Sequence, residues 1–502
     1  MILRKIIYVL FVLVFTASIH ADSNEPSKDS LTVNIEQTIL MAMENNRSLV
    51  VQKMNPEIAR TYEQGELSIF DPTLNAEISQ RRTVSDRLSR AGSSTENQTV
   101  DSINGSVSID KYFSSGTTLS LEGTTSYTDS SLYSDKFVSN RLGVTVTQAL
   151  LQGLDVRANM ARIHQASIET LISEYELRGF SEVLLEQVEI SFWEYALAQK
   201  QIDIYTNSLE LARKQMDEIQ ERINIGTLAE TELAAAQAEV ALRYENLISA
   251  RSILHQIRLN MLVLLNPSDE IDWNMDIILQ YQTALPEIEL DDVEQHVKVA
   301  MKMRPDLNQA RLLIKHGELE VVKTQNGLLP KLDAFVTFGS SGYAATFDKA
   351  LSNIKDDSYD AAFGLTFQYP ISNKSDKARH TRAVLSKQQM LKAYDNLVQL
   401  AQVDIRSAYI EVTGAREQIN ATEATRKLQE EKLRVENEKF SVGRSTSLLV
   451  AQAQRDLVES QIAEIRAKTY YLKSLVSLFS LEGSLLQRRG IEAPGSQPVI
   501  LE

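Results

Sequence analysis

The segment Glu182–Gly226 reads EVLLEQVEISFWEYALAQKQIDIYTNSLELARKQMDEIQERINIG, and its pattern decides the fold class. Apolar residues recur every three or four positions between Glu, Gln and Lys, which is typical of a helix with one packed face. Helical character continues without proline from Asp155 to Asn224, and such a helix would be about 100 Å long. We expect lengthwise packing on other helices through Val183, Val188, Ile190, Trp193, Tyr195, Leu197, Ile202, Ile204, Leu209 and Leu211.

A second proline-free helical segment of similar length runs from Lys374 to Phe440. Each long helix has two shorter candidates whose combined length nearly equals its own, so we predict that they stack end to end, antiparallel to it. The shorter helices are Arg47–Leu67 and Leu228–Leu265 in the first half, and Pro305–Gly327 and Thr446–Ser480 in the second. A small helix is expected before each set, near Ile35–Asn45 and Leu290–Met303.

The chain contains an internal repeat. Ala42–Leu49 aligns with Ala300–Leu307, and Ile225-Gly226 aligns with Val442-Gly443. The first half has extra residues in a Ser, Thr and Gly-rich region at about 79–140. The predicted domains are a signal peptide at 1–21, a first structural repeat at 32–267, an inter-repeat linker at 268–288, a second repeat at 289–482 and a flexible C-terminal tail at 483–502.

The N-terminus predicts export. Arg4 and Lys5 precede an apolar run from Ile6 to Phe15, and small residues lead up to a predicted cleavage after Ala21. The alternative is an uncleaved anchor, but an apolar run of about ten residues is short against the roughly 20 that a spanning helix needs. No later segment has enough consecutive apolar residues for a transmembrane helix.

Between the helices the period changes to two. Leu74, Ala76 and Ile78 alternate with polar residues, and so do segments near Leu142–Val146, Val336–Phe338 and Phe363–Phe367. A soluble sandwich would alternate in the same way. In an exported chain beside helices of about 100 Å, we favour a lipid-facing barrel wall with a polar lumen. Too few strands are present to close a channel, so this interpretation requires oligomerisation.

Composition excludes several classes of function. The chain has no cysteine, and its formal charge of -15 argues against general nucleic-acid binding. The six histidines are scattered without a metal-ligand spacing, and neither a phosphate-binding loop nor a Gly-x-Ser-x-Gly motif is present. We predict that the protein is not an enzyme and has no cofactor, metal or catalytic site.

Several motifs occur twice in the same order. They are the Pro-linked segments Phe70–Leu74 and Leu328–Leu332, the strand-to-helix segments Gln148–Gly153 and Gln368–Ile371, and the turns Arg222–Gly226 and Lys439–Gly443. With the signal peptide and the repeat, they resemble the TolC family of outer-membrane efflux and secretion channels over about residues 32–482. The resemblance implies a mixed α and β membrane protein: a homotrimer whose shared outer-membrane β-barrel continues as a periplasmic α-helical barrel.

The resemblance also implies a passive exit duct of a tripartite efflux pump or a type I secretion system. Its partners would be a periplasmic adaptor protein, an inner-membrane transporter and outer-membrane lipid. The alternative hypothesis is a soluble periplasmic coiled-coil adaptor or structural protein. By the resemblance, each protomer contributes four strands to a twelve-stranded barrel, but Gly105–Phe113 and Thr117–Tyr127 predict an additional hairpin. That hairpin either extends the barrel or forms a flap outside it.

The resemblance places adaptor docking at two helix tips, formed by Ile225, Gly226, Thr227, Val442, Gly443, Arg444, Ser445 and Thr446. Glycine suits both turns because a helix that ends and reverses needs a left-handed residue. Thr227 and either Ser445 or Thr446 are expected to cap the helices that follow. A periplasmic constriction would involve Glu232, Leu449 and Gln452. Glu232 is interpreted either as one of a ring of three carboxylates or as a solvated surface residue.

Overall fold

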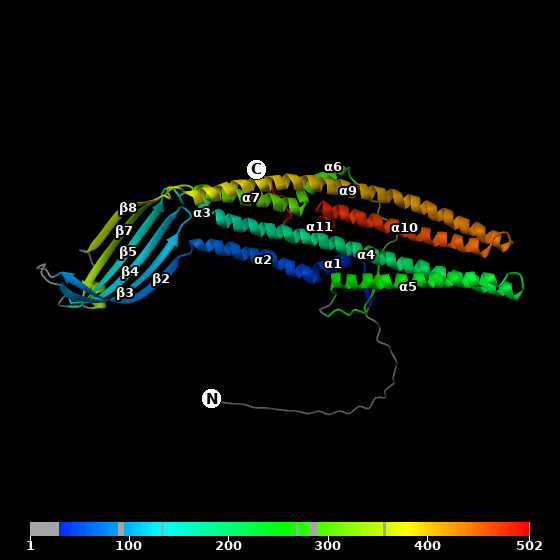
Figure 1. The fold of residues 1–502 in the computed structure, drawn as a ribbon, viewed down its shortest axis with the longest axis horizontal. Helices are drawn as coiled ribbons and strands as arrows, with labels where there is room; N and C mark the ends of the chain where they lie inside the picture. Colours follow the sequence, from blue (N-terminus) through cyan, green and yellow to red (C-terminus); the bar gives the residue numbers. More distant parts are fainter. Residues whose placement is uncertain are drawn as a thin grey trace, which may run out of the picture.

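The computed structural model describes residues 30–88, 95–131, 135–267, 270–281, 289–354 and 358–500. The predicted signal peptide lies outside these residues. Figure 1 shows an elongated molecule with one β-sheet at one end, from which long helices run to the opposite end. The change of sequence period from two to about 3.6 therefore corresponds to a spatial division between a sheet and a helical body.

The helical body begins with α1 (Ile35–Asn45) and α2 (Arg47–Leu67), as the sequence predicted. The long helices are α4 (Ala161–Asn224) and α9 (Lys374–Ser441). The predicted start of the first at Asp155 is corrected, because the short α3 (Val156–Asn159) precedes α4 and Met160 separates them. The remaining helices of the body are α5 (Thr231–Leu265), α6 (Val293–Met303), α7 (Pro305–Asn326), α10 (Ser447–Leu481) and α11 (Leu485–Arg488).

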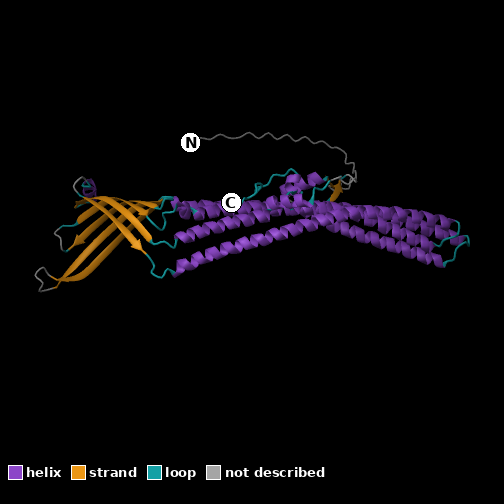
Figure 2. Ribbon diagram, turned by 90° about the horizontal axis from the view of Figure 1, so that it is seen from above, coloured by secondary structure: helices purple, strands orange, loops and turns teal. Residues whose placement is uncertain are grey.

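The shorter helices pack along the long ones in the predicted arrangement. Both α2 and α5 contact α4, while α7 and α10 contact α9. Helix α4 also contacts α7 and α10, so it joins the two sets. Figure 2 shows the helices running side by side along the length of the body. Each half of the chain thus has the same succession: a short helix, a medium helix, strands, a long helix and a further helix.

The sheet has six antiparallel strands in the order β2-β3-β4-β5-β7-β8. Following the 3-10 turn Ser68–Phe70, these are β2 (Thr73–Leu88), β3 (Thr95–Tyr112), β4 (Thr117–Ser130), β5 (Phe137–Ala149), β7 (Lys331–Ala344) and β8 (Tyr359–Gln368). The additional hairpin is β3–β4. It lies between β2 and β5, so it widens the sheet instead of forming a separate flap, and the expected four strands become six.

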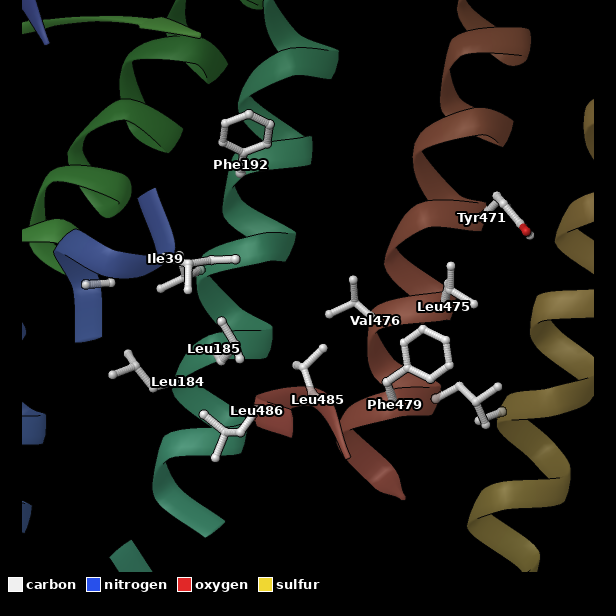
Figure 3. Close-up of a cluster of buried hydrophobic side chains, with 14 of the residues drawn as sticks. Ile39, Leu184, Leu185, Phe192, Tyr471, Leu475, Val476, Phe479, Leu485 and Leu486 are labelled. Atoms are coloured by element: carbon white, nitrogen blue, oxygen red, sulfur yellow. The ribbon is translucent and has the colours of Figure 1, made fainter. Parts of the chain in front are cut away.

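The largest hydrophobic core lies where the helices of both halves meet. It includes Leu185 and Phe192 of α4, both with no exposed surface, and Leu475 and Phe479 of α10. Figure 3 shows these side chains of α4 and α10 together with Ile39 of α1 and with Leu485 and Leu486 of α11. The predicted stripe on α4 is correct at Val188, Tyr195 and Leu209 but incomplete. Val183 and Leu211 are 49% and 45% exposed. The reason is that α4 contacts helices on several sides, so Leu184, Leu185 and Phe192, which lie outside the predicted stripe, are buried as well.

The predicted linker region contributes structure of its own. Strand β6 (Asp276–Leu279) pairs in parallel with β1 (Ser30–Val33), which lies at the start of the described chain. The Tyr195 hydroxyl of α4 donates a hydrogen bond to the Ile277 carbonyl at 3.0 Å. Arg258 of α5 pairs with Asp276 at 2.8 Å. These contacts fix the connection between the halves to the middle of the helical body.

The C-terminal segment is predicted to be flexible, but its first residues are packed against the helices and a few later ones contact them. Leu485 and Leu486 of α11 have no exposed surface. Further on, the Val499 N–H donates to the Asn308 side chain at 2.9 Å, and the Tyr175 hydroxyl donates to the Gln497 carbonyl. The proline-containing composition of the segment predicts disorder. Composition does not reveal these contacts, because Asn308 and Tyr175 come close to the segment only when the helices have assembled.

Buried carboxylates hold the start of this segment. Arg489 makes two hydrogen bonds with Glu189 of α4, at 2.7 and 2.6 Å, and Glu482 contacts His296 of α6 at 2.7 Å. Burial alone would raise the pKa of Glu482, but hydrogen bonds from His296 and Ser484 lower it. Glu182 behaves differently. Burial raises its pKa to about 7, although the hydrogen bond from the Leu486 N–H and the charge of Arg178 both lower it.

We predict a pH-dependent stability from Glu182. Its pKa rises from 4.5 to about 7 on folding, so between these values the folded state binds more protons than the unfolded state. This carboxyl therefore lowers the free energy of unfolding as pH rises from 4.5 to about 7. Thermal unfolding at a series of pH values should show a flatter profile for Glu182→Gln than for the unmodified chain.

The exposed Glu218→Gln on the same helix is the matched control, and its profile should follow that of the unmodified chain. Parallel profiles for Glu182→Gln and the unmodified chain would contradict the assignment.

Candidate functional site

The two helix tips at the end of the body opposite the sheet have the same backbone geometry. Gly226 and Gly443 both have φ of 74°, in the left-handed region. The Gly226 N–H donates to the Ile223 carbonyl at 2.9 Å, and the Thr227 N–H donates to the Arg222 carbonyl at 2.8 Å. The second tip repeats this pattern, with Gly443 N–H bonded to Phe440 and Arg444 N–H bonded to Lys439. This is the Schellman motif, which satisfies the last carbonyls of a helix.

The caps of the following helices are only partly as predicted. Thr446 caps α10, because its hydroxyl accepts a hydrogen bond from the Leu449 N–H. Ser445 instead donates to Glu436 at 2.8 Å. The expectation for Thr227 is wrong: its hydroxyl donates back to the Arg222 carbonyl at 2.8 Å, and α5 starts later, at Thr231. Thr227 therefore stabilises the end of α4. It lies four residues before the start of α5, which is too far away to cap that helix.

Apolar side chains project from both tips. Ile225 is 73% exposed and Val442 is 70% exposed, and they occupy equivalent positions immediately before the two glycines. Arg222 lies over the Phe440 ring at 4.8 Å, so the two tips contact each other. Each tip thus presents one exposed apolar residue, and the contact between Arg222 and Phe440 holds the two tips next to each other.

The residues predicted for a constriction do not form one cluster. Glu232 of α5 accepts a hydrogen bond from the hydroxyl of Ser447 at the start of α10. Leu449 and Gln452 are exposed on α10. Residues two apart on a helix face different directions, so Leu449 points away from the side on which Ser447 meets Glu232. Ser447 is the contact that sequence reasoning missed, since a serine at a helix start indicates only capping.

A second polar link joins the same two hairpins. Glu239 of α5 contacts Arg455 of α10 at 3.4 Å and Arg243 of α5 at 3.2 Å. Burial lowers the pKa of Arg243, while Glu239 opposes this shift. Together with the Glu232–Ser447 hydrogen bond, this link keeps the α4–α5 and α9–α10 hairpins together near their tips.

At the other end of the molecule, the sheet has two chemically different faces. A row of paired residues crosses all six strands on one face: Leu74, Ile109, Leu121, Val144, Phe338 and Ala361. The adjacent row, on the opposite face, is Asn75, Ser108, Glu122, Gly143, Gly339 and Asp360. The apolar residues are exposed in the single chain, with Phe363 at 89%. In these two rows the predicted alternation is therefore continuous across all six strands.

An ion pair spans three strands on the polar face. Arg141 of β5 binds both carboxylate oxygens of Asp360 of β8, at 3.0 and 2.7 Å, although β7 lies between them. The guanidinium lies over Gly143 and Gly339, where an added Cβ would approach within 2.6 and 2.5 Å of it. Because glycine has no side chain at these two positions, the Arg141 side chain can lie flat across the sheet and reach Asp360.

The described residues provide little for other chemistry. Among them, no group of three or more His, Cys, Asp or Glu side chains is arranged to hold a metal ion. Across the same parts of the chain, no helix is both long and apolar enough to cross a membrane. The features that remain are the exposed apolar residues at the helix tips and the two faces of the sheet.

A sheet with one apolar and one polar face, joined end-on to a long helical body, fits a membrane protein of the channel class. The chain belongs to the outer membrane efflux protein family, whose sequence model matches residues 114–266 and 297–484. The resemblance to the TolC family is thereby confirmed. The protein is an outer-membrane efflux channel component that extends into the periplasm, and the alternative of a soluble periplasmic coiled-coil protein is set aside.

Solved structures share the fold. A membrane protein from Pseudomonas aeruginosa is 18% identical, with a TM-score of 0.67 and coverage of 91% of each chain. The CmeC outer membrane channel of Campylobacter jejuni is 15% identical, with a TM-score of 0.66 and 94% of each chain covered. The outer membrane protein VceC of Vibrio cholerae is 16% identical, with a TM-score of 0.64, covering 89% of this chain and 96% of that one. A search of curated protein sequences gave no match.

We predict that Gly443 tolerates only residues suited to a left-handed backbone. A Cβ at Gly443 would have no atom within 4 Å, so a substitution there tests backbone strain alone. A β-branched residue in this conformation costs about 1–2 kcal/mol, whereas Asn adopts it more readily. Gly443→Val should therefore speed hydrogen exchange of the amides in the last turn of α9, and Gly443→Asn should change it much less.

Equal exchange in both variants and the unmodified chain would contradict this role of Gly443.

Proposed function

We propose that three copies of this chain form one exit duct, with a shared β-barrel in the outer membrane and a helical tunnel in the periplasm. The strand directions support closure. The edge strands β2 and β8 run in opposite directions, so β2 of one copy can pair antiparallel with β8 of the next. Unpaired edges are a liability that a closed barrel removes. Six strands from each of three copies would make eighteen, a size at which barrels leave an aqueous channel.

The two faces of the sheet assign inside and outside in this barrel. The row from Leu74 to Ala361 would face lipid, because a transmembrane wall presents apolar residues there. The face that carries Glu122, Arg141 and Asp360 would line the lumen. This continuous two-faced sheet is the observation that carries the proposal.

Exposed apolar residues on the helices support a tunnel of several copies. On α9, Leu385, Leu400, Val403, Ile410 and Leu428 are all more than half exposed. A single chain leaves this surface in water, whereas neighbouring copies would cover it. We infer that these residues pack between protomers.

The duct would conduct passively, as the resemblance to the TolC family implies. An inner-membrane transporter would supply energy, and a periplasmic adaptor would dock on the helix tips around Ile225 and Val442. Both a tripartite efflux pump and type I secretion fit this arrangement, and the exported substrate can be a small molecule or a polypeptide. Near the tips, the Glu232–Ser447 hydrogen bond would hold the entrance narrow, while exposed Leu449 and Gln452 are proposed to lie along it.

The first experiment is fractionation of cells followed by light scattering of the detergent extract. The chain of 56.4 kDa should be found in the outer membrane and should elute at three times its own mass once bound detergent is subtracted. A monomer or dimer in detergent would contradict the shared barrel.

A second prediction concerns the entrance. Glu232→Ala removes the hydrogen bond to Ser447, so the hairpins should separate more easily and single-channel conductance in planar bilayers should increase. The exposed Glu230→Ala, two residues earlier, is the matched control and should leave conductance unchanged. An unchanged conductance for Glu232→Ala would show that this contact does not restrict the channel.

A further inference from the structure

A short helix covers the far end of the sheet. Helix α8 (Phe347–Ser352) lies in the connection between β7 and β8, at the end of the sheet away from the helical body (Figure 1). Ala350 has no exposed surface and sits over Gly342, where an added Cβ would lie 2.1 Å from the Ala350 carbonyl. The Asn140 side chain of β5 donates to the Phe347 carbonyl at 3.0 Å. Helix α8 is therefore fixed against β5 and β7.

The face that α8 covers is the apolar one. Asn140 pairs with Gly342, and both lie on the same side of the sheet as Val144 and Phe338 because residues two or four apart on a strand share a face. A loop of a channel could equally have folded over the polar face. Here it extends over the face assigned to lipid.

A groove of about 440 Å³ lies between α8 and strands β2 to β5. Its walls are apolar, formed by Ile78, Val107 and Leu142 of the sheet and by Phe347, Leu351 and Ile354 of the connection. Gly105 and Gly123 lie on the floor, and their missing side chains deepen it. The groove opens onto the apolar surface of the sheet, whose neighbouring residues Ala76 and Ile78 are part of its lining.

We propose that this groove binds one acyl chain of a phosphate-bearing lipid of the outer leaflet. The proposal rests on the proposed function, which places the apolar face in the membrane and this end of the sheet on the outer side. The groove is continuous with that lipid-facing surface, so an acyl chain can enter it without crossing water. Peptide strand addition is disfavoured because the strands that form most of its floor, β3, β4 and β5, already pair on both edges.

The polar side of α8 fits a lipid headgroup. Phe347, Leu351 and Ile354 recur at helical spacing toward the groove, while Lys349 is exposed on the other side. In the described part of the chain, no carboxylate lies within ion-pair distance of the Lys349 ammonium. The polar side of α8 carries the exposed pair Asp348 and Lys349, and a helix with an apolar face and a polar face that includes Lys is typical of membrane interfaces. Lys349 is therefore placed to contact the lipid phosphate.

Native mass spectrometry of the full chain reconstituted with phosphatidylglycerol tests the proposal. The unmodified chain should retain phosphatidylglycerol, up to one molecule per protomer. Ala76→Phe fills the groove and should lose the bound lipid. Ala361→Phe makes the same change on the same apolar face outside the groove, and should retain it. Equal retention by Ala76→Phe and the unmodified chain, or no retention by either, would overturn the proposal.

The headgroup contact has its own readout. Lys349→Gln should lower retention of phosphatidylglycerol but should leave retention of uncharged diacylglycerol unchanged. Equal losses for both lipids would overturn the role of Lys349.

A fluorescence measurement locates the lipid. In vesicles of phosphatidylglycerol with brominated acyl chains, Phe347→Trp should lose most of its added fluorescence, and Ala76→Phe in the same chain should restore it. Tyr343→Trp lies on the polar face and should not be quenched. Quenching of Phe347→Trp that Ala76→Phe leaves unchanged would indicate ordinary surface lipid and overturn the groove.

Every variant is first tested for its trimeric mass in detergent. A chain that forms no trimer would contradict the proposed function, whereas a trimer without retained lipid would contradict only the groove.

Discussion

The lengthwise packing of α4 is the constraint on which the rest of the structure depends. This helix contacts α2 and α5 from its own half of the chain and α7 and α10 from the other half. Leu185 and Phe192, at its centre, have no exposed surface. Because α4 is one unbroken helix from Ala161 to Asn224, it connects the sheet at one end of the molecule to the tips at the other. An outer-membrane channel component that extends into the periplasm needs such a long element.

The sheet is governed by a different rule, the alternation of faces along each strand. A shift of register by one residue would exchange the apolar and polar faces, so the continuous rows across six strands show that register is uniform. Local features follow from it. Gly143 and Gly339 make room for Arg141 on the polar face, while Gly105 and Gly123 hollow the apolar face beneath α8.

The helix tips show how far local signals reach. The glycines and the residues that follow them predicted two reversals, and both have the same left-handed geometry. A local pattern did not reveal that Thr227 bonds back to α4, because a hydroxyl near a turn can serve either helix. The Glu232–Ser447 contact joins residues from different halves of the chain, so it depends on how the hairpins pack.

Sequence by itself determined the elements that repeat a strong local period: the two long helices, their shorter partners, the alternating strands and the turn glycines. These depend on residues close together in the chain, whose spacing sets which side of an element is apolar. Tertiary structure alone decided which residues of α4 are buried, how the tail from Leu485 is packed and where the β3–β4 hairpin joins the sheet. Each of these depends on the position of neighbours distant in sequence, and the free energy of burial is gained only when those neighbours are in place.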